Sequence, residues 1–495
     1  MIARRRIDPI LVAIVVLAAG LRLVGLDAEP FWLDEAHTAN FTRLTLAELW
    51  SFDDPFDTVN PPGFIVLMKL WSQVSRSDLW FRLLPAIAGI ATIPIVHAIG
   101  RRVMNRRVGL IAAGLLAVSG YHVRYSQEAR AYSLITLCAA AALWAVIRLL
   151  DLDASDRRLW VWPVLVYGVA TGLSMHLHNT AVGIPLAANL AVAIWWFRHR
   201  PDGLFRAWTL ANLTALVVWS PWLPGFITQL GLVQANFWVP QPTAASVLRD
   251  LGVVFDAYAD LVVPGLGSLW FHAAVLTAAA AGMWWGGRAA KPQHRLVLWS
   301  FVVVQPVFQL VFSLSKPVFL SRTQLWILLA AVVLLALAVD RSLGAAPGRP
   351  WVMVPAFVMA VFTIGTVGYH FAFHKTAWDE AAAAVAADAG PDDVILVLAG
   401  NTVVAFDRYF ERYGLDVPRI RIPWDIPGRV STGSTLSPDD IDRIAALGED
   451  HDRVWLVLNS VGNIAAGGEL APALADRLSR VESLSLFEVR VQAFE

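Results

Sequence analysis

Two adjacent carboxylates, Asp34 and Glu35, carry the sharpest chemical signal in the sequence. They follow the first long apolar segment directly, where a membrane-spanning chain reaches the surface. Neighbouring residues do not share one helix face, so one carboxylate could serve as an acid or base while the other caps a helix or meets a cation. The alternative is an acidic pair that opens a helix over residues 36–46, which the helix dipole favours.

Four cationic residues, Arg124, Arg130, Lys316 and Arg322, stand at outer ends of apolar segments. Any one of them alone is typical of a side chain that extends to the lipid headgroups. Together with the acidic pair they favour an anionic ligand such as a lipid phosphate. Arg binds phosphate oxygens in a fork and Lys acts as a point charge.

Two histidines, His176 and His178, flank one apolar residue at another outer connection. Such residues are typical interfacial hydrogen-bonding groups. They could also bind a metal together with Asp34 or Glu35, although no His-x-x-x-His spacing supports a metal site. A divalent metal therefore stays open, and no other cofactor is indicated.

The composition is that of a polytopic membrane protein. Of the 495 residues, 57% are hydrophobic and 16% charged, against roughly 45–50% and 25% in soluble domains. The 39 basic and 39 acidic residues cancel, which gives no indication of a nucleic-acid partner. The single cysteine, Cys138, excludes an intramolecular disulfide.

Eleven segments are apolar over about the length that a spanning helix needs. Their bounds are 10–26, 83–100, 108–121, 132–150, 160–177, 181–197, 204–226, 267–286, 296–314, 324–339 and 351–373.

Lys and Arg clusters fall on every second connection between these segments, which predicts a cytoplasmic N-terminus and an extracytoplasmic C-terminus in the cell membrane. If the apolar stretch 61–74 crossed the membrane, the later Lys and Arg clusters would lie on its outer side. We therefore place it as a helix in the outer interface, within one extracytoplasmic loop over 27–80. A second surface helix is predicted over 244–261.

After Phe373 the pattern changes to alternating helices and strands with ordinary charge. Helices are predicted over 379–389 and 403–413 and from residue 437, with buried strands at 394–398 and 454–458. The predicted architecture is a mainly α polytopic membrane domain over 1–373, followed by a small extracytoplasmic α/β domain over 374–495 with a mainly parallel sheet.

An ordered set of motifs resembles bacterial relatives of the protein O-mannosyltransferases and of the aminoarabinose transferases, in the C-type (GT-C) membrane glycosyltransferase superfamily. The resemblance is strongest up to about Leu150 and collinear through Arg322. The motifs are Arg22-Leu23, Trp32-Leu33-Asp34-Glu35-Ala36, Asn60-Pro61-Pro62-Gly63, Arg82-Leu83-Leu84-Pro85 and Ser126-Gln127-Glu128-Ala129-Arg130-Ala131-Tyr132.

This resemblance implies a GT-C-like fold, a polyprenyl-phosphate sugar donor and inversion at the anomeric carbon, with Asp34 as general base and Glu35 beside it. The sugar would be mannose-like or a pentose, and the acceptor a glycan, lipid or protein hydroxyl. It also implies that Arg130, Tyr132 and Arg322 lie near the donor phosphate. Asn60 stands where the family often has His or Lys. The remaining predicted substrate-binding residues are Arg124, Gln127, Glu128, His176, His178 and Lys316.

Two other classes remain as alternatives. A transporter or flippase of lipid-linked sugars predicts ionisable residues near the bilayer midplane, whereas the charges here gather at segment ends. A non-catalytic membrane scaffold has no use for an acidic loop and cationic helix ends together.

Overall fold

The computed structural model describes residues 8–52, 57, 60–151, 160–232, 239–343, 353–398, 402–426, 436–459 and 466–495. The chain divides into two compact units. The first comprises residues 1–26 and 42–373, and the second comprises residues 27–41 and 374–495. The predicted boundary after Phe373 recurs here. The predicted division differs in one respect, because it assigned the 27–41 segment to the membrane domain.

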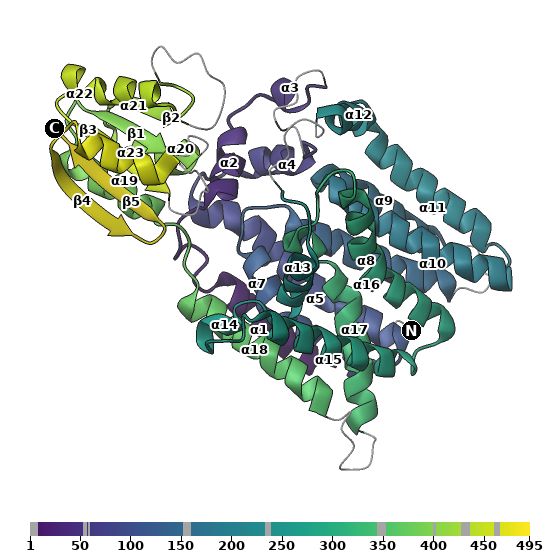
Figure 1. The fold of residues 1–495 in the computed structure, drawn as a ribbon. Coiled ribbons are helices and arrows are strands. Elements are labelled where there is room, and N and C mark those ends of the chain that lie inside the picture. Colours follow the sequence, from purple (N-terminus) through teal and green to yellow (C-terminus); the bar gives the residue numbers. More distant parts are fainter. Residues whose placement is uncertain are drawn as a thin grey trace. The chain divides into compact units, whose positions relative to one another are not determined.

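The first unit is helical throughout the part that the structure describes (Figure 1). Each of the eleven predicted apolar segments contains a helix. The helices are α1 (Pro9–Leu23), α3 (Leu46–Leu49), α4 (Gly63–Trp71), α5 (Asp78–Val103), α6 (Arg106–Ala117), α7 (Gly120–Ser126), α8 (Tyr132–Leu150), α9 (Val161–Leu177), η2 (Asn179–Val182), α10 (Gly183–His199), α11 (Leu204–Trp219), η3 (Ser220–Trp222), α12 (Leu223–Leu232), α13 (Ala244–Asp256), α14 (Ala259–Val262), α15 (Leu269–Gly287), α16 (Pro292–Ser313), η4 (Ser321–Gln324), α17 (Ile327–Leu343) and α18 (Met353–Ala372).

Among the described residues, five helices are long and apolar enough to cross a membrane, or six if the bent pair α6 and α7 forms one span. The chain is therefore a multi-pass membrane protein, while the number eleven stays a prediction. The distribution of buried and exposed apolar side chains also indicates that lipid surrounds the helices. Helix α17 is apolar all round and almost wholly buried, whereas α11 exposes Phe205, Leu213 and Val217. Apolar side chains on the outside of a helical bundle are stable where the surroundings are lipid.

The predicted span 108–121 is wrong in detail, because the helix ends at Ala117 and a new helix, α7, leaves at 64°. Arg22, fully buried in α1, explains the bend. Its guanidinium donates to the carbonyls of Leu116 and Ala117 at 3.2 and 3.1 Å and lies 2.8 Å from His122 Nδ1. Carbonyls at a helix end have no partner within the helix, so this arginine stabilises the break that orients α7.

The two predicted surface helices are present, in shorter form. Helix α4 begins after Pro62, whose missing N–H costs nothing at a helix start. The second helix is divided into α13 and α14 by Tyr258, which takes a left-handed backbone conformation with φ 65°. The structure gives no membrane plane, so their interfacial placement stays a prediction.

The second unit is an α/β domain. Its elements are α2 (Leu33–Phe41), α19 (Trp378–Asp388), β1 (Val394–Leu398), α20 (Val403–Phe410), η7 (Glu411–Tyr413), β2 (Arg419–Ile422), α21 (Pro438–Ala445), α22 (Leu447–Asp450), β3 (Val454–Asn459), α23 (Ala466–Ala475), β4 (Arg480–Leu486) and β5 (Val489–Phe494).

The five-stranded sheet has the order β2-β1-β3-β5-β4. Strands β1, β2 and β3 are parallel, while β5 runs antiparallel to both β3 and β4. The predicted sheet is thus correct for β1 and β3, but the terminal hairpin makes it mixed. Both faces of β1 are buried, with Leu470 and Leu474 of α23 in the core on one face. This explains the uninterrupted apolar run at 394–398.

Candidate functional site

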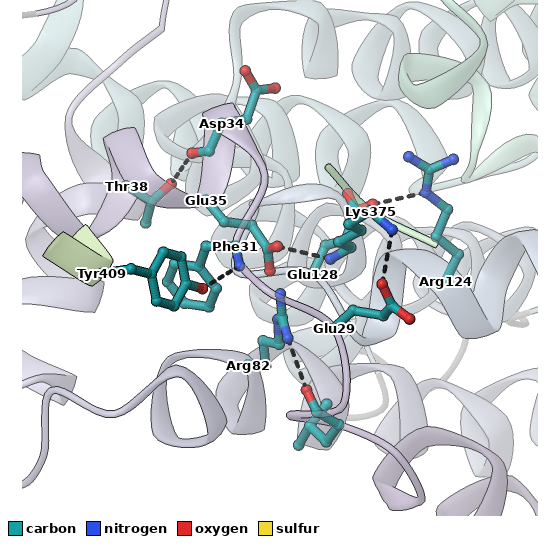
Figure 2. A network of polar contacts seen from close by, with 11 residues as sticks. Glu29, Phe31, Asp34, Glu35, Thr38, Arg82, Arg124, Glu128, Lys375 and Tyr409 are labelled. Atoms are coloured by element: carbon teal, nitrogen blue, oxygen red, sulfur yellow. Dashed lines mark hydrogen bonds and ion pairs between the residues drawn. The ribbon is translucent and has the colours of Figure 1, made fainter. Parts of the chain in front are cut away.

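The acidic pair lies in the first turn of α2, within the second unit. The two carboxylates point in different directions (Figure 2). Glu35 is fully buried, and its Oε2 lies 2.7 Å from Nζ of Lys375, whose side chain is 3% exposed. Asp34 is partly exposed. The pair thus opens a helix, which begins earlier than the predicted 36–46, and Glu35 meets a cation. The role of Asp34 as acid or base stays a prediction.

The loop before α2 is attached to the same unit by several contacts. The backbone N–H of Phe31 donates to the Tyr409 hydroxyl at 2.5 Å, as Figure 2 shows. Arg408 lies 4.3 Å above the Phe31 ring. The carboxylate of Glu29 accepts from the backbone N–H of Lys375 at 2.8 Å.

Arg124 and the fully buried Glu128 form an ion pair in the first unit, at 2.7 Å between Nε and Oε1 (Figure 2). Arg124 also donates to the Tyr258 hydroxyl and lies 4.9 Å above the Phe373 ring. Glu128 is fully buried, and its Oε2 has no hydrogen-bond partner among the described residues. A buried carboxylate oxygen without a partner is costly in a folded protein, so it is a candidate contact for a ligand.

A pocket in the first unit contains two of the predicted phosphate-binding residues, Tyr132 and Arg322. The Arg322 guanidinium lies 5.9 Å from the Tyr132 ring. Polar and apolar groups share the lining. It consists of Tyr132, Ile135, Thr136, Thr180, Arg322, Thr323, Leu325 and Trp326.

Buried amides fix the short helix η4, which carries Arg322. Gln309 of α16 accepts from Thr323 at 2.9 Å and from Gln324 at 2.6 Å. Gln305, one turn earlier, donates to the Thr323 carbonyl at 3.0 Å. Sequence reasoning missed both glutamines. Two amides four positions apart on one face of an apolar helix were the available signal.

Aromatic contacts connect this pocket with the Arg124–Glu128 pair. Tyr125, which lies under the Arg124 guanidinium, packs edge-on against Tyr132 at 5.2 Å. The His178 ring lies 5.9 Å from that of Tyr132. The structure therefore brings together residues of α7, α8 and η4 and of the connections that follow α7 and α9. They are Arg124, Glu128, Tyr132, His178 and Arg322. Arg130 lies in the connection between α7 and α8, where its backbone N–H donates to the backbone carbonyl of Glu128 at 2.7 Å.

Three other predicted substrate-binding residues bond to backbone carbonyls instead. Gln127 donates to Val24 at 2.9 Å, and His176 Nε2 lies 2.9 Å from the Val218 carbonyl. Lys316 donates to Leu230 at 3.0 Å. These contacts give each residue a structural role, and their predicted contact with substrate stays untested.

Asn60 belongs to a chain of carboxamides. Its side chain donates to Asp57 at 3.0 Å, and its carbonyl accepts from Gln229 at 2.8 Å. Gln229 in turn accepts from Asn179, the neighbour of His178, at 3.1 Å. The Asn60 motif is thereby tied to the end of α9.

Two features of the loop around α13 were missed by sequence reasoning. Asp256 is buried and lies 2.8 Å from Nδ1 of His272, and burial raises the pKa of its carboxyl. Burial also raises the pKa of the Tyr258 hydroxyl to about 12, so it meets Arg124 as a neutral phenol. A helix break beside an aspartate gave no distinctive pattern.

No group of three or more His, Cys, Asp or Glu side chains that could hold a metal occurs among the described residues. One ring nitrogen of each predicted histidine has a protein partner, since Nε2 of His176 lies 2.9 Å from the Val218 carbonyl and Nδ1 of His178 accepts from the Thr180 N–H at 3.1 Å. The open question of a divalent metal gains no support from this arrangement.

Comparisons with known proteins bear on this arrangement. Residues 59–224 match the family described as dolichyl-phosphate-mannose-protein mannosyltransferase. A comparison with curated protein sequences finds no match.

Solved structures match over almost the whole chain. ArnT from Cupriavidus metallidurans in the apo state has a TM-score of 0.62 at 15% identity, over 98% of this chain and 97% of that one. The same protein bound to undecaprenyl phosphate gives 0.60, with the same identity and coverage. The oligosaccharyltransferase AglB from Archaeoglobus fulgidus, in complex with an inhibitory peptide and a dolichol-phosphate, has a TM-score of 0.52 at 13% identity. The match covers 98% of this chain and 74% of that one.

These comparisons confirm the resemblance predicted from the motifs, and the likeness of fold to ArnT covers 98% of the chain. The family match begins at residue 59, after the Asp34 motif, so it does not cover the acidic pair.

Proposed function

We propose that this chain, which shares its fold with membrane glycosyltransferases of the GT-C superfamily, transfers a sugar from a polyprenyl-phosphate donor to a hydroxyl group outside the cell membrane. The observation that carries the proposal is the pocket beside Arg322 and Tyr132, in a fold whose neighbour ArnT binds undecaprenyl phosphate. Its sugar is mannose-like or a pentose, and its acceptor is a glycan, lipid or protein.

The residues that line the pocket include both kinds of group that a lipid phosphate would contact. The Arg322 guanidinium offers a charged donor for phosphate oxygens, while Ile135, Leu325 and Trp326 offer apolar surface. Buried amides of α16 hold η4 through Thr323, which fixes the backbone that carries the arginine before the donor binds. A preoriented donor stabilises developing charge without reorganisation in the transition state.

The reaction is a displacement with inversion. The acceptor oxygen attacks C1 of the sugar as its proton passes to the Asp34 carboxylate. The bond from C1 to the phosphate oxygen breaks, and its electron pair leaves on the lipid phosphate. Arg130 and Arg322 stabilise that negative charge. Arg124 contributes indirectly, because it packs on Tyr125, which in turn contacts Tyr132. The lipid phosphate is a competent leaving group, so no nucleotide is required.

The proposal includes the orientation predicted from charge, with the N-terminus in the cytoplasm and the reaction on the outer face. The Lys and Arg clusters support this orientation.

Incubation of the purified protein with a labelled polyprenyl-phosphate sugar and a cell-envelope extract tests the proposal. We expect a labelled acceptor from the wild type, and from Asp34→Asn about 10³-fold less product with unchanged binding of the lipid, since the base is lost. Full activity of this variant would remove the assigned role. Movement of lipid across vesicles without a glycosylated product would favour a flippase instead.

A further inference from the structure

The segment that carries Asp34 belongs to the C-terminal α/β fold rather than to the helices that flank it in the sequence. Residues 27–41 form one compact unit with residues 374–495, and α2 packs on α20. Glu35 and Lys375, which join these two parts, are 340 positions apart in the chain. A base in a transferase would thus be carried by a domain to which the sequence assigns no chemistry.

Two contacts fix this segment on either side of Asp34. Before it, the backbone N–H of Phe31 donates to the Tyr409 hydroxyl, so this hydroxyl is one of the groups that hold the backbone there. After it, the Glu35 carboxylate meets the Lys375 ammonium at 2.7 Å, with both groups almost wholly excluded from solvent. Charge-assisted hydrogen bonds are short and directional. The pair therefore restricts the rotation of α2 as well as the distance between Glu35 and Lys375.

Fixing Glu35 also fixes the direction of Asp34. Successive residues of an α-helix differ by about 100° around its axis, and both residues lie in the first turn of α2. Once the Glu35 side chain points to Lys375, the Cα–Cβ bond of Asp34 has one direction. The helix cannot rotate as a unit without breaking the ion pair. Thr38, which donates to the Asp34 carbonyl at 3.0 Å, holds the same turn from within.

We propose that Lys375 and Tyr409 are positioning residues for the Asp34 carboxylate, with Glu35 as their anchor rather than as a second base. The inference rests on the proposed function, because it assigns the C-terminal unit a part in catalysis only if Asp34 is the base. Its expected size follows from geometry. A displacement of about 1 Å at a reacting group can cost on the order of 10²-fold in rate.

Two sets of variants of the full-length protein test this proposal. Tyr409→Phe keeps the ring and removes only the oxygen that accepts from Phe31. The double variant Glu35→Gln with Lys375→Met removes both charges, which avoids leaving a buried charge without its partner. In each we expect kcat to fall by about 10-fold or more, with the KM for the lipid donor unchanged.

A matched control comes from the same unit. Trp455 donates to Asp393 at 2.8 Å in a buried contact that does not touch the 27–41 segment. Trp455→Phe therefore lowers the melting temperature without changing kcat per folded molecule. Hydrogen exchange supplies a second readout, since Tyr409→Phe should accelerate exchange of the amides over 31–38 while Trp455→Phe should not.

The outcomes separate this inference from the proposed function. If Asp34→Asn abolishes transfer while Tyr409→Phe and the double variant keep the wild-type kcat, the positioning role is wrong and the base remains. If Asp34→Asn itself keeps full activity, the proposed function fails. Loss of activity in Tyr409→Phe that scales only with the unfolded fraction would also overturn the positioning role, because that is the result expected of a structural contact.

Discussion

Glu35 and Glu128 are both fully buried, and each meets a cation at 2.7 Å, yet the two pairs are built differently. Lys375, the partner of Glu35, is itself excluded from solvent, and the pair joins two segments of one domain. Arg124, the partner of Glu128, lies four residues away in the chain and is 22% exposed, and Oε2 of Glu128 has no hydrogen-bond partner among the described residues.

This difference separates a closed pair from an open one. A closed pair has its charges compensated by each other and is costly to break, so it mainly holds structure. An open pair keeps a carboxylate oxygen for a third group. We therefore expect variants of Glu35 to change stability first, and variants around Glu128 and Arg322 to change binding and turnover first.

The largest effect is expected from Glu35→Gln. It leaves the Lys375 ammonium buried without its counter-charge, which should destabilise the C-terminal unit by about 3 kcal/mol. Thermal unfolding of the purified protein, followed by tryptophan fluorescence, measures this loss. A melting temperature equal to that of the wild type would mean that the pair is not closed.

The next largest effect is expected from Arg322→Met in the pocket. It removes a charged donor and keeps a side chain of similar length, and we expect turnover to fall by about 10²-fold with an unchanged melting temperature. Lys316→Met is the matched control, since the partly exposed Lys316 lies outside the pocket lining and donates to the Leu230 carbonyl. Equal losses in the two variants would argue against a special role for Arg322.

A smaller effect is expected from Glu128→Gln. The amide oxygen can still accept from Arg124, so folding should be nearly unchanged, while the charge and one accepting oxygen are lost. We expect kcat/KM to fall by about 10-fold, which corresponds to about 1.4 kcal/mol of transition-state stabilisation. Steady-state kinetics with the lipid donor provide the measurement. A drop in melting temperature as large as that of Glu35→Gln would remove the contrast between the two pairs.

The smallest effect is expected from an exposed pair, Arg421 and Asp425, at 2.5 Å in the second unit. Arg421→Gln should cost less than about 0.5 kcal/mol, because both side chains are solvated. The hydrogen bond from Arg421 lowers the pKa of the Asp425 carboxyl below its ordinary 3.8. Its contribution is therefore present above about pH 3.8 and is lost as the pH falls further. The free energy of unfolding of the wild type and of Arg421→Gln, measured at pH 7 and at pH 3, tests this. A difference between the two proteins that is equal at both pH values would contradict the assignment.

Local pattern was sufficient for much of the fold. Apolar segment length predicted where the helices lie, because backbone groups in lipid must be paired within their own segment. The run 394–398 likewise predicted a strand buried on both faces. The strands β2, β4 and β5 were missed. Strand β4 is exposed over most of its length, so its residues carry no periodic burial signal.

The candidate site was predicted in its residue types and only partly in its arrangement. Tyr132 and Arg322, which the resemblance places near the donor phosphate, line one pocket, and their contact with a donor stays a prediction. By contrast, Gln127, His176 and Lys316 were grouped with them because they stand in outer loops, and the structure gives them carbonyl partners. Loop membership fixes the side of the membrane on which a residue lies, but not the direction of its side chain.

The sequence alone therefore determined which segments are apolar, where the charges stand and which residues could do chemistry, since these follow from composition and short-range periodicity. Only the tertiary structure decided that Arg22 stabilises a helix break, that Gln305 and Gln309 hold η4, and that Glu35 pairs with Lys375. Each of these contacts joins residues from different elements. Their partners are selected by packing and by the cost of leaving a buried polar group unpaired, and neither is encoded in local pattern.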